Sequence, residues 1–189
     1  MSYVSLATLA PITQNSILRQ GALALFGSWM LAGLSQVSVG GPVPMTLQTF
    51  GVLLIGLTFG FRLAFATLAA YLIQGAIGLP VFAGGAGGAS HFVGPSGGYL
   101  VGFLLSATLI GLLADKGFTR GWVGMIIALL AGTAVIYAFG LPWLGSIVGY
   151  DKMLAYGFTP FVLGDTIKLV LAALIGKGVL KGAATFART

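Results

Sequence analysis

Two ionisable residues stand inside the last apolar run of this sequence, and their types and spacing suit the binding of a polar solute. Asp165 and Lys168 lie within residues 161–175, which are otherwise uncharged. Charged groups in such a run rarely face lipid, and a spacing of three residues places both on one side of a helix. Either the pair neutralises itself and fixes helix packing, or one or both residues hold a solute. A carboxylate accepts N–H groups, whereas an ammonium suits an anion.

A stiff segment with two prolines, residues 42–49 (PVPMTLQT), offers neutral hydrogen-bonding groups. Thr46 and Gln48 follow the prolines. Thr46 is also a candidate N-cap for the helix that begins there. Because a cap does not occupy Gln48, the segment can both start a helix and contribute to a site.

Residues 83–99 are dense in glycine, with the stretches AGGAGG and GPSGGY. No Gly-Lys-Ser/Thr follows, so this is not a phosphate loop; it is either a flexible loop or a lid over a ligand. Tyr99 would then supply an aromatic wall with a hydroxyl. We expect His91, the one histidine, at the surface or hydrogen-bonded and not on a ligand. With no second His or Cys nearby, no metal site is predicted.

The elements that position these residues are predicted to lie in a membrane. Hydrophobic residues make up 58% of the 189 positions and charged residues 6%, with a mean hydropathy of +1.05. A soluble domain has about 25% charged residues, and a water-exposed surface of this composition would aggregate. Lipid is therefore the expected solvent. Nucleic acid is not an expected partner despite the net charge of +6, because the basic residues are scattered.

Six apolar runs predict an all-α integral membrane bundle of six transmembrane helices, forming one domain over residues 1–189. A straight span needs about 20 residues, so the shorter runs are expected to extend into adjoining segments. We expect the fifth helix to end before a loop with Pro142 and Trp143, since Pro often follows a helix end. The runs are residues 17–34, 47–61, 63–77, 99–114, 122–139 and 161–175.

Basic residues predict the orientation, because cytoplasmic loops carry an excess of Lys and Arg. With six spans, both termini and the short second-to-third and fourth-to-fifth connections share one side, expected to be cytoplasmic. The longer loops opposite, where Lys152 is the one exposed cation, would build the site at the outer face. Residues 1–20 lack a signal-peptide pattern. The residues on the basic side are Arg19, Arg62, Lys116, Arg120, Lys177, Lys181 and Arg188.

Small residues repeat every four positions in the first run, at Ala24, Ser28 and Ala32. Such a stripe lets another helix approach closely. The approaching helix belongs either to this protein or to a different membrane subunit. Gly27 and Gly33 offer competing registers for the stripe.

In their order along the chain, these motifs resemble those of the BioY family, the biotin-binding S components of energy-coupling factor (ECF) transporters. The resemblance covers residues 19–181. Ser96 stands where the family often has Thr, a change that keeps the hydroxyl. The matching segments are residues 42–49, 75–85 (GAIGLPVFAGG), 94–100 (GPSGGYL), 142–143 (PW) and 164–168 (GDTIK).

The resemblance implies high-affinity capture of biotin from outside by a multi-pass protein of the prokaryotic cell membrane. It implies no cofactor, and coupling to a membrane-embedded T subunit and two ABC-type ATPases through the stripe of Ala24, Ser28 and Ala32. Asp165 is the candidate for the ureido N–H groups of biotin, and Lys168 either meets the carboxylate tail or keeps Asp165 charged. The other candidates are Thr46 and Gln48 for the carbonyl or the tail, Tyr99, Phe82 and Trp143 for the apolar ring, and Gly84 and Gly85 for the lid.

Two rival functions belong to other classes. One is a stand-alone secondary carrier or facilitator for biotin. The sequence has neither an ATP-binding P-loop nor the paired broken helices of an inverted-repeat carrier, so energy from partner subunits is the simpler expectation. The other is an intramembrane enzyme. One His, no Cys and no Glu leave few catalytic groups, and no catalytic residue is predicted.

Overall fold

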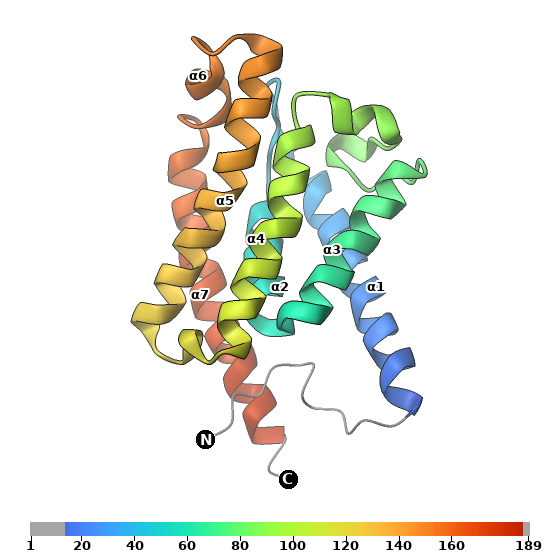
Figure 1. Cartoon of the computed structure of the whole chain (residues 1–189), viewed down its shortest axis with the longest axis vertical. Coiled ribbons are helices and arrows are strands. Elements are labelled where there is room, and N and C mark those ends of the chain that lie inside the picture. Colours follow the sequence, from blue (N-terminus) through green and yellow to red (C-terminus); the bar gives the residue numbers. More distant parts are fainter. Residues whose placement is uncertain (1–13, 187–189) are drawn as a thin grey trace.

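The computed structural model describes residues 14–186 as an almost entirely helical molecule (Figure 1). Most of the segment assessed for a signal peptide lies outside this range, as does Arg188. In chain order the elements are α1 (Gln14–Gln36), β1 (Ser38–Val39), β2 (Met45–Thr46), α2 (Gln48–Phe59), α3 (Phe61–Ala76), the 3-10 turns η2 (Ala83–Gly85) and η3 (Ala89–Val93), α4 (Gly97–Asp115), η4 (Phe118–Arg120), α5 (Trp122–Val148), α6 (Met153–Gly157) and α7 (Phe161–Phe186).

The connections between helices gather at two opposite ends of the bundle (Figure 1). The antiparallel β1–β2 hairpin, the η2–η3 segment and α6 lie at one end. The α2–α3 turn, η4, the start of α1 and the end of α7 lie at the other. The chain thus runs back and forth between these two ends. The glycine- and proline-containing loops lie at one end, and most of the basic residues lie at the other.

Within residues 14–186, four helical stretches are long and apolar enough to cross a membrane: Ile17–Gln36, Gly97–Asp115, Trp122–Val148 and Met153–Ala183. The helices α2 and α3 are apolar but shorter, with 12 and 16 residues. The all-helical prediction is confirmed, with four helices of spanning length where six spans were expected. Nearly all of α2 is buried, so neighbouring helices and not lipid surround this short element.

The distribution of apolar side chains differs from that of a water-soluble protein. Large apolar residues are exposed on the outer faces of α1, α5 and α7, for example Phe26, Trp29 and Leu163. A monomer in water rarely exposes so extensive an apolar surface. The outside of the bundle is therefore suited to contact with lipid.

Pro142 lies inside α5, so the prediction that this helix ends at residue 139 before a loop is wrong. Proline removes one backbone hydrogen bond and costs a helix interior about 3 kcal/mol. Packing against α4 compensates, because α4 and α5 form the most extensive helix pair. A Cβ added at Gly98 of α4 would lie 2.4 Å from the Phe139 carbonyl oxygen. The close contact permitted by this glycine supports α5 on both sides of the proline, and the helix continues to Val148.

The small-residue stripe of α1 faces the inside of this chain. Ala24, Ser28 and Ala32 are buried, with exposed fractions of 7%, 0% and 6%. The Ser28 hydroxyl accepts a hydrogen bond of 3.1 Å from the Gln74 amide of α3, and α1 packs extensively on α3. The stripe therefore serves packing within this protein, the first of the two alternatives, and coupling of these residues to a separate membrane subunit stays a prediction.

Two charged side chains, Asp115 and Lys177, connect helices at the end of the bundle opposite the hairpin. The Asp115 carboxylate, at the end of α4, accepts a 2.9 Å hydrogen bond from the Phe61 backbone N–H at the start of α3. The Lys177 ammonium of α7 donates to the Arg120 carbonyl and lies 5.4 Å from the centre of the Trp122 ring. A carboxylate at a helix N-terminus is favourable, so these contacts hold the short connections in place.

Candidate ligand-binding site

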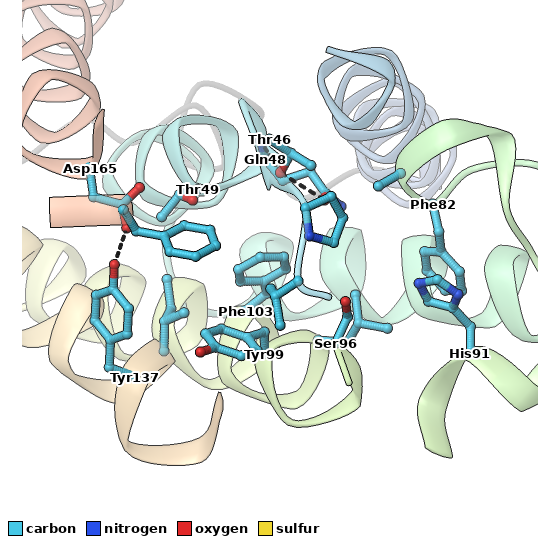
Figure 2. Close-up of a pocket in the computed structure, with 16 residues that line it drawn as sticks. Thr46, Gln48, Thr49, Phe82, His91, Ser96, Tyr99, Phe103, Tyr137 and Asp165 are labelled. Atoms are coloured by element: carbon cyan, nitrogen blue, oxygen red, sulfur yellow. Dashed lines mark hydrogen bonds between the residues drawn. The ribbon is translucent and has the colours of Figure 1, made fainter. Parts of the chain in front are cut away.

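A cavity lies at the end of the bundle that carries the hairpin and the η2–η3 segment. Its atom-free volume is about 530 Å³, counting the open solvent at its mouth. No single segment builds it, since the hairpin, α2, the η2–η3 segment, α4, α5 and α7 all contribute (Figure 2). The lining residues are Val43, Pro44, Thr46, Gln48, Thr49, Phe82, Ala83, His91, Ser96, Tyr99, Leu100, Phe103, Ile136, Tyr137, Phe161 and Asp165.

Asp165 forms the acidic end of the cavity, one turn inside α7. Its two carboxylate oxygens accept from different donors: the Tyr137 hydroxyl of α5 at 2.6 Å and the Lys168 ammonium at 2.9 Å. Asp165 and Lys168 are 8% and 9% exposed. The compensating charge and hydrogen bonds make burial of the carboxylate tolerable. A carboxylate has about four lone-pair sites, so Asp165 retains acceptor capacity on the cavity side.

The hairpin and the start of α2 supply a preorganised amide. The Thr46 hydroxyl donates to Gln48 Oε1 at 2.9 Å, and Gln48 Nε2 donates to the Tyr71 hydroxyl at 2.5 Å. The Tyr71 hydroxyl in turn donates to the Val81 carbonyl at 2.9 Å. Leu47, not Thr46, occupies the N-cap position, although the Thr46 hydroxyl accepts from the Gln48 backbone N–H at 3.2 Å. This chain of bonds fixes the Gln48 side chain beside the cavity.

The η2–η3 segment closes the cavity opposite Asp165, and we call residues 78–96 the lid. Phe82 anchors it: the ring is 1% exposed and packs over Gly75 of α3. A Cβ at Gly75 would lie 2.0 Å from Phe82 Cζ, so only glycine leaves room for the ring. The Phe82 ring also meets Tyr71 edge to face at 5.5 Å and stacks on His91 at 4.9 Å.

Aromatic residues of α4 and α5 form the wall between the acidic end and the lid. The Tyr99 hydroxyl donates to the Gly157 carbonyl at 2.9 Å, which ties the ring to α6 while the ring lines the cavity. Tyr99 and Tyr137 meet edge to face at 6.4 Å, and Phe158 lies 5.1 Å from Tyr137. The wall is therefore rigid and largely apolar, with its hydroxyls engaged elsewhere.

Such a site can bind an elongated, mostly apolar solute that has a polar N–H end. Few polar groups converge on apolar walls, which is the usual composition of a ligand pocket. Among the described residues, no three His, Cys, Asp or Glu side chains gather to hold a metal ion.

Five of the nine residues proposed from the sequence for ligand binding line the cavity: Asp165, Gln48, Thr46, Tyr99 and Phe82. Lys168 is not among the lining residues and binds Asp165 instead. The Asp165–Lys168 ion pair that the spacing suggested is therefore present, and Asp165 also faces the cavity.

Trp143, Gly84 and Gly85 are not among the residues that line the cavity, although the two glycines lie within the lid. Because α5 continues past Pro142, Trp143 lies 40% exposed at its outer end, where the indole N–H donates to the Gly94 carbonyl at 2.9 Å. Gly84 and Gly85 have φ of +69° and +74°, a conformation that glycine adopts readily. They turn the chain so that its neighbours Phe82 and Ala83 face the cavity.

Sequence reasoning missed several lining residues. His91 was expected away from a ligand, yet it lines the cavity and stacks on Phe82. Tyr137 was not singled out, although a hydroxyl within the apolar run 122–139 is a signal of the kind that Asp165 gave. The other missed lining residues of α4, α5 and α7 are Leu100, Phe103, Ile136 and Phe161; nothing in their local sequence distinguishes them from other core residues.

Known proteins resemble this chain in sequence and in structure. A model of the BioY family matches residues 7–185. The "Biotin transporter BioY" of Thermotoga maritima is 45% identical over 155 residues, covering 82% of this chain and 87% of that protein. The "Probable biotin transporter BioY" of Pyrococcus horikoshii is 41% identical over 156 residues, covering 82% and 91%. A crystal structure of the S-component for biotin from an ECF-type ABC transporter matches with a TM-score of 0.81 at 30% identity, covering 90% of this chain and 95% of that one.

The fold and the cavity define a membrane-type helical bundle that holds a solute site near one end. The chain belongs to the BioY family, a family of transporter S components and not of enzymes.

Proposed function

We propose that this protein is the high-affinity biotin-binding subunit of an ECF-type vitamin transporter and captures biotin at the outer face of the cell membrane. The observation that carries the proposal is the cavity itself: a buried carboxylate at one end of an aromatic and apolar pocket. The similarity to proteins named biotin transporters supports it.

The chemistry of biotin suits the groups that line the cavity. Its ureido ring has two N–H donors and one carbonyl, its second ring is an apolar thioether, and its tail ends in a carboxylate. Asp165 accepts the ureido N–H groups, and Gln48 with Thr46 lies close enough to the same cavity to serve the carbonyl. Tyr99 and Phe82 cover the apolar ring. A hydrogen bond to a charged group contributes about 1.5–3 kcal/mol, so Asp165 carries most of the polar recognition.

Lys168 acts through Asp165 in this proposal and does not bind the tail. Its ammonium is 2.9 Å from Asp165 Oδ1, whereas the cavity wall does not include it. The positive charge offsets that of Asp165, which makes the carboxylate less costly to bury. Lys168 is thus a positioning residue.

The protein crosses the cell membrane six times in this proposal, with both termini in the cytoplasm. Two features support it: the grouping of connections at two ends of the bundle and the enrichment of Lys and Arg at one of them. The short helix α2 is nearly all buried, so it can complete a crossing among other helices without being long enough to span lipid alone. The site then opens outward.

Energy for uptake comes from a membrane-embedded T subunit and two ABC-type ATPases. The sequence contains no P-loop, and the structural relative is an S-component of an ECF-type ABC transporter. Ala24, Ser28 and Ala32 are buried within this chain, so docking of the T subunit on this stripe would require neighbouring elements to move, whereas docking on another surface of the chain would not.

Purified protein from cells grown with and without biotin tests the proposal. Mass spectrometry of the released ligand is expected to find intact biotin, and titration calorimetry of the ligand-free preparation is expected to show saturable binding with one site per chain. Dethiobiotin, which keeps the ureido ring but lacks the thioether, serves as the comparison ligand. A preparation that retains no biotin and shows no saturable heat would contradict the proposal.

Proteoliposomes separate the ECF reading from a stand-alone carrier. Vesicles that contain this protein alone are expected to take up no biotin, whereas vesicles that also contain the T subunit and the ATPases take it up with ATP. Counterflow with the protein alone would establish the carrier instead.

A further inference from the structure

His91 occupies the lid end of the cavity. It lies in η3, partly buried, with its ring stacked on Phe82 at 4.9 Å and an interplanar angle of 20°. It lines the cavity. Within residues 14–186, the structure gives the ring nitrogens no hydrogen-bond or ion-pair partner. The imidazole is therefore held in place by stacking while its N–H group remains unused.

His91 differs from the neutral hydroxyl and amide donors of the cavity wall because its ring can carry a positive charge. Among the lining residues, His91 is the one side chain that can become positively charged. Lys168 is engaged with Asp165. The lid contains no other titratable residue. The helices packed against η3 are α3 and α4, and their tyrosines beside the cavity, Tyr71 and Tyr99, donate their hydroxyls to backbone carbonyls.

The cavity has chemically different ends, and Figure 2 shows them apart. Asp165 and Tyr137 lie at one side of the view and His91 with Phe82 at the other, with Phe103 and Tyr99 between them. Biotin has the same polarity: N–H donors on its ring system and a carboxylate at the end of a flexible apolar chain. A ligand with its ureido ring at Asp165 extends its tail toward the lid.

We propose that His91 binds the carboxylate tail of biotin and thereby makes the site selective for a free-acid tail over a neutral one. The inference rests on the proposed function of the cavity and adds the residue that recognises the tail. Even a neutral imidazole has one N–H to donate. Because the nitrogens of the His91 ring have no other partner in the described part of the chain, this N–H is available to the carboxylate. His91 also connects the tail to the lid, because the stack on Phe82 places both rings in one unit.

Affinity for biotin is expected to increase on acidification. Burial lowers the pKa of His91 below its usual value of 6.5, while a bound carboxylate favours the protonated ring. Protonation is therefore linked to biotin binding, and the gain develops as the pH falls through the usual pKa of histidine and below it. It is absent for a neutral ligand. Asp165 faces the same cavity from α7 but binds Tyr137 and Lys168 at the opposite end.

Titration calorimetry with biotin and biotinamide, whose tail is an uncharged amide, tests the inference on His91→Asn in the full chain. Biotin affinity is expected to fall about tenfold, as for loss of one charge-assisted bond, while biotinamide affinity changes less than twofold. Val93→Asn is the matched control, because Val93 lies in the same 3-10 turn, is 71% exposed and does not line the cavity. It should leave both affinities unchanged.

Three results would overturn the inference while leaving the proposed function intact. An equal loss of affinity for both ligands would assign His91 to lid packing, and no loss of affinity for either ligand would remove His91 from the site. A pH dependence of affinity that biotinamide shares would assign the titration to a group other than His91. If neither ligand binds the unaltered protein, the proposed function itself fails.

Discussion

At the scale of single residues, the site depends on a buried charge whose partners are all identified. Asp165 combines two roles: it pairs with Lys168 along α7 and presents acceptor capacity to the cavity. Removing one member of a buried ion pair typically costs 3–5 kcal/mol, whereas replacing both is far less costly. Stability and ligand binding can therefore be separated by comparing single and double variants.

Asp165→Asn is expected to weaken biotin binding by well over tenfold and to lower the thermal unfolding midpoint, because the charge of Lys168 is left buried without compensation. Adding Lys168→Met should restore the unfolding midpoint but not the affinity. Calorimetry and thermal unfolding in detergent measure the two quantities. Recovery of tight binding in the double variant would show that the carboxylate does not contact biotin.

At the scale of elements, the lid is positioned by packing against the helices beneath it. Phe82 fills the space that Gly75 leaves on α3, and the Gln36 amide of α1 donates to the Phe82 carbonyl at 3.2 Å. The Ser35 hydroxyl lies 2.8 Å from the Val81 carbonyl. The base of the lid is thus fixed to α1 and α3, although the lid itself is rich in glycine.

Gly75→Ala is expected to weaken biotin binding several-fold, because its Cβ would overlap Phe82 and push the ring from the cavity wall. Overpacking of this kind costs about 1–3 kcal/mol of stability. Binding and unfolding assays check both effects. Gly33→Ala is the matched control, since nothing lies within 4 Å of its added Cβ. Combining Gly75→Ala with Phe82→Leu should recover stability. Unaltered affinity in the single variant would show that the position of Phe82 does not matter for the ligand.

At the scale of the whole molecule, the ligand-binding cavity and most of the basic residues lie at opposite ends of the bundle. The loops that build the site lie at one end, and most of the basic residues lie at the other (Figure 1). The exposed apolar faces of α1, α5 and α7 lie between these ends. This arrangement fits a protein that captures its ligand on one side of a membrane and is anchored in orientation by charge on the other.

The chain has no cysteine, so single introduced cysteines can test the orientation directly. Lys152 near α6 and Lys116 after α4 are both exposed and lie at opposite ends of the bundle (Figure 1). In intact cells, a membrane-impermeant maleimide is expected to label Lys152→Cys. Lys116→Cys should be labelled only after the membrane is permeabilised. The reverse pattern, or labelling of both in intact cells, would contradict the proposed topology.

Much of the fold was predictable because local composition determines it. The six apolar runs correspond to α1, α2, α3, α4, α5 and α7, and the segments around Thr46, Phe82 and Asp165 do line one cavity. The end of α5 was not predictable from Pro142. The sequence shows that Pro142 destabilises a helix locally. The packing against α4 that outweighs this cost comes from residues about forty positions earlier in the chain.

The sequence by itself determined the lipid environment, the helices and the two residues, Asp165 and Lys168, whose charges needed an explanation, since composition and apolar run length act locally. Only the tertiary structure decided which side chains face the cavity. It placed His91 and Tyr137 there, left Trp143 outside, and buried Ala24, Ser28 and Ala32 within the bundle. The reason is that the direction a helix face takes depends on contacts between segments far apart in the chain, and no local pattern encodes them.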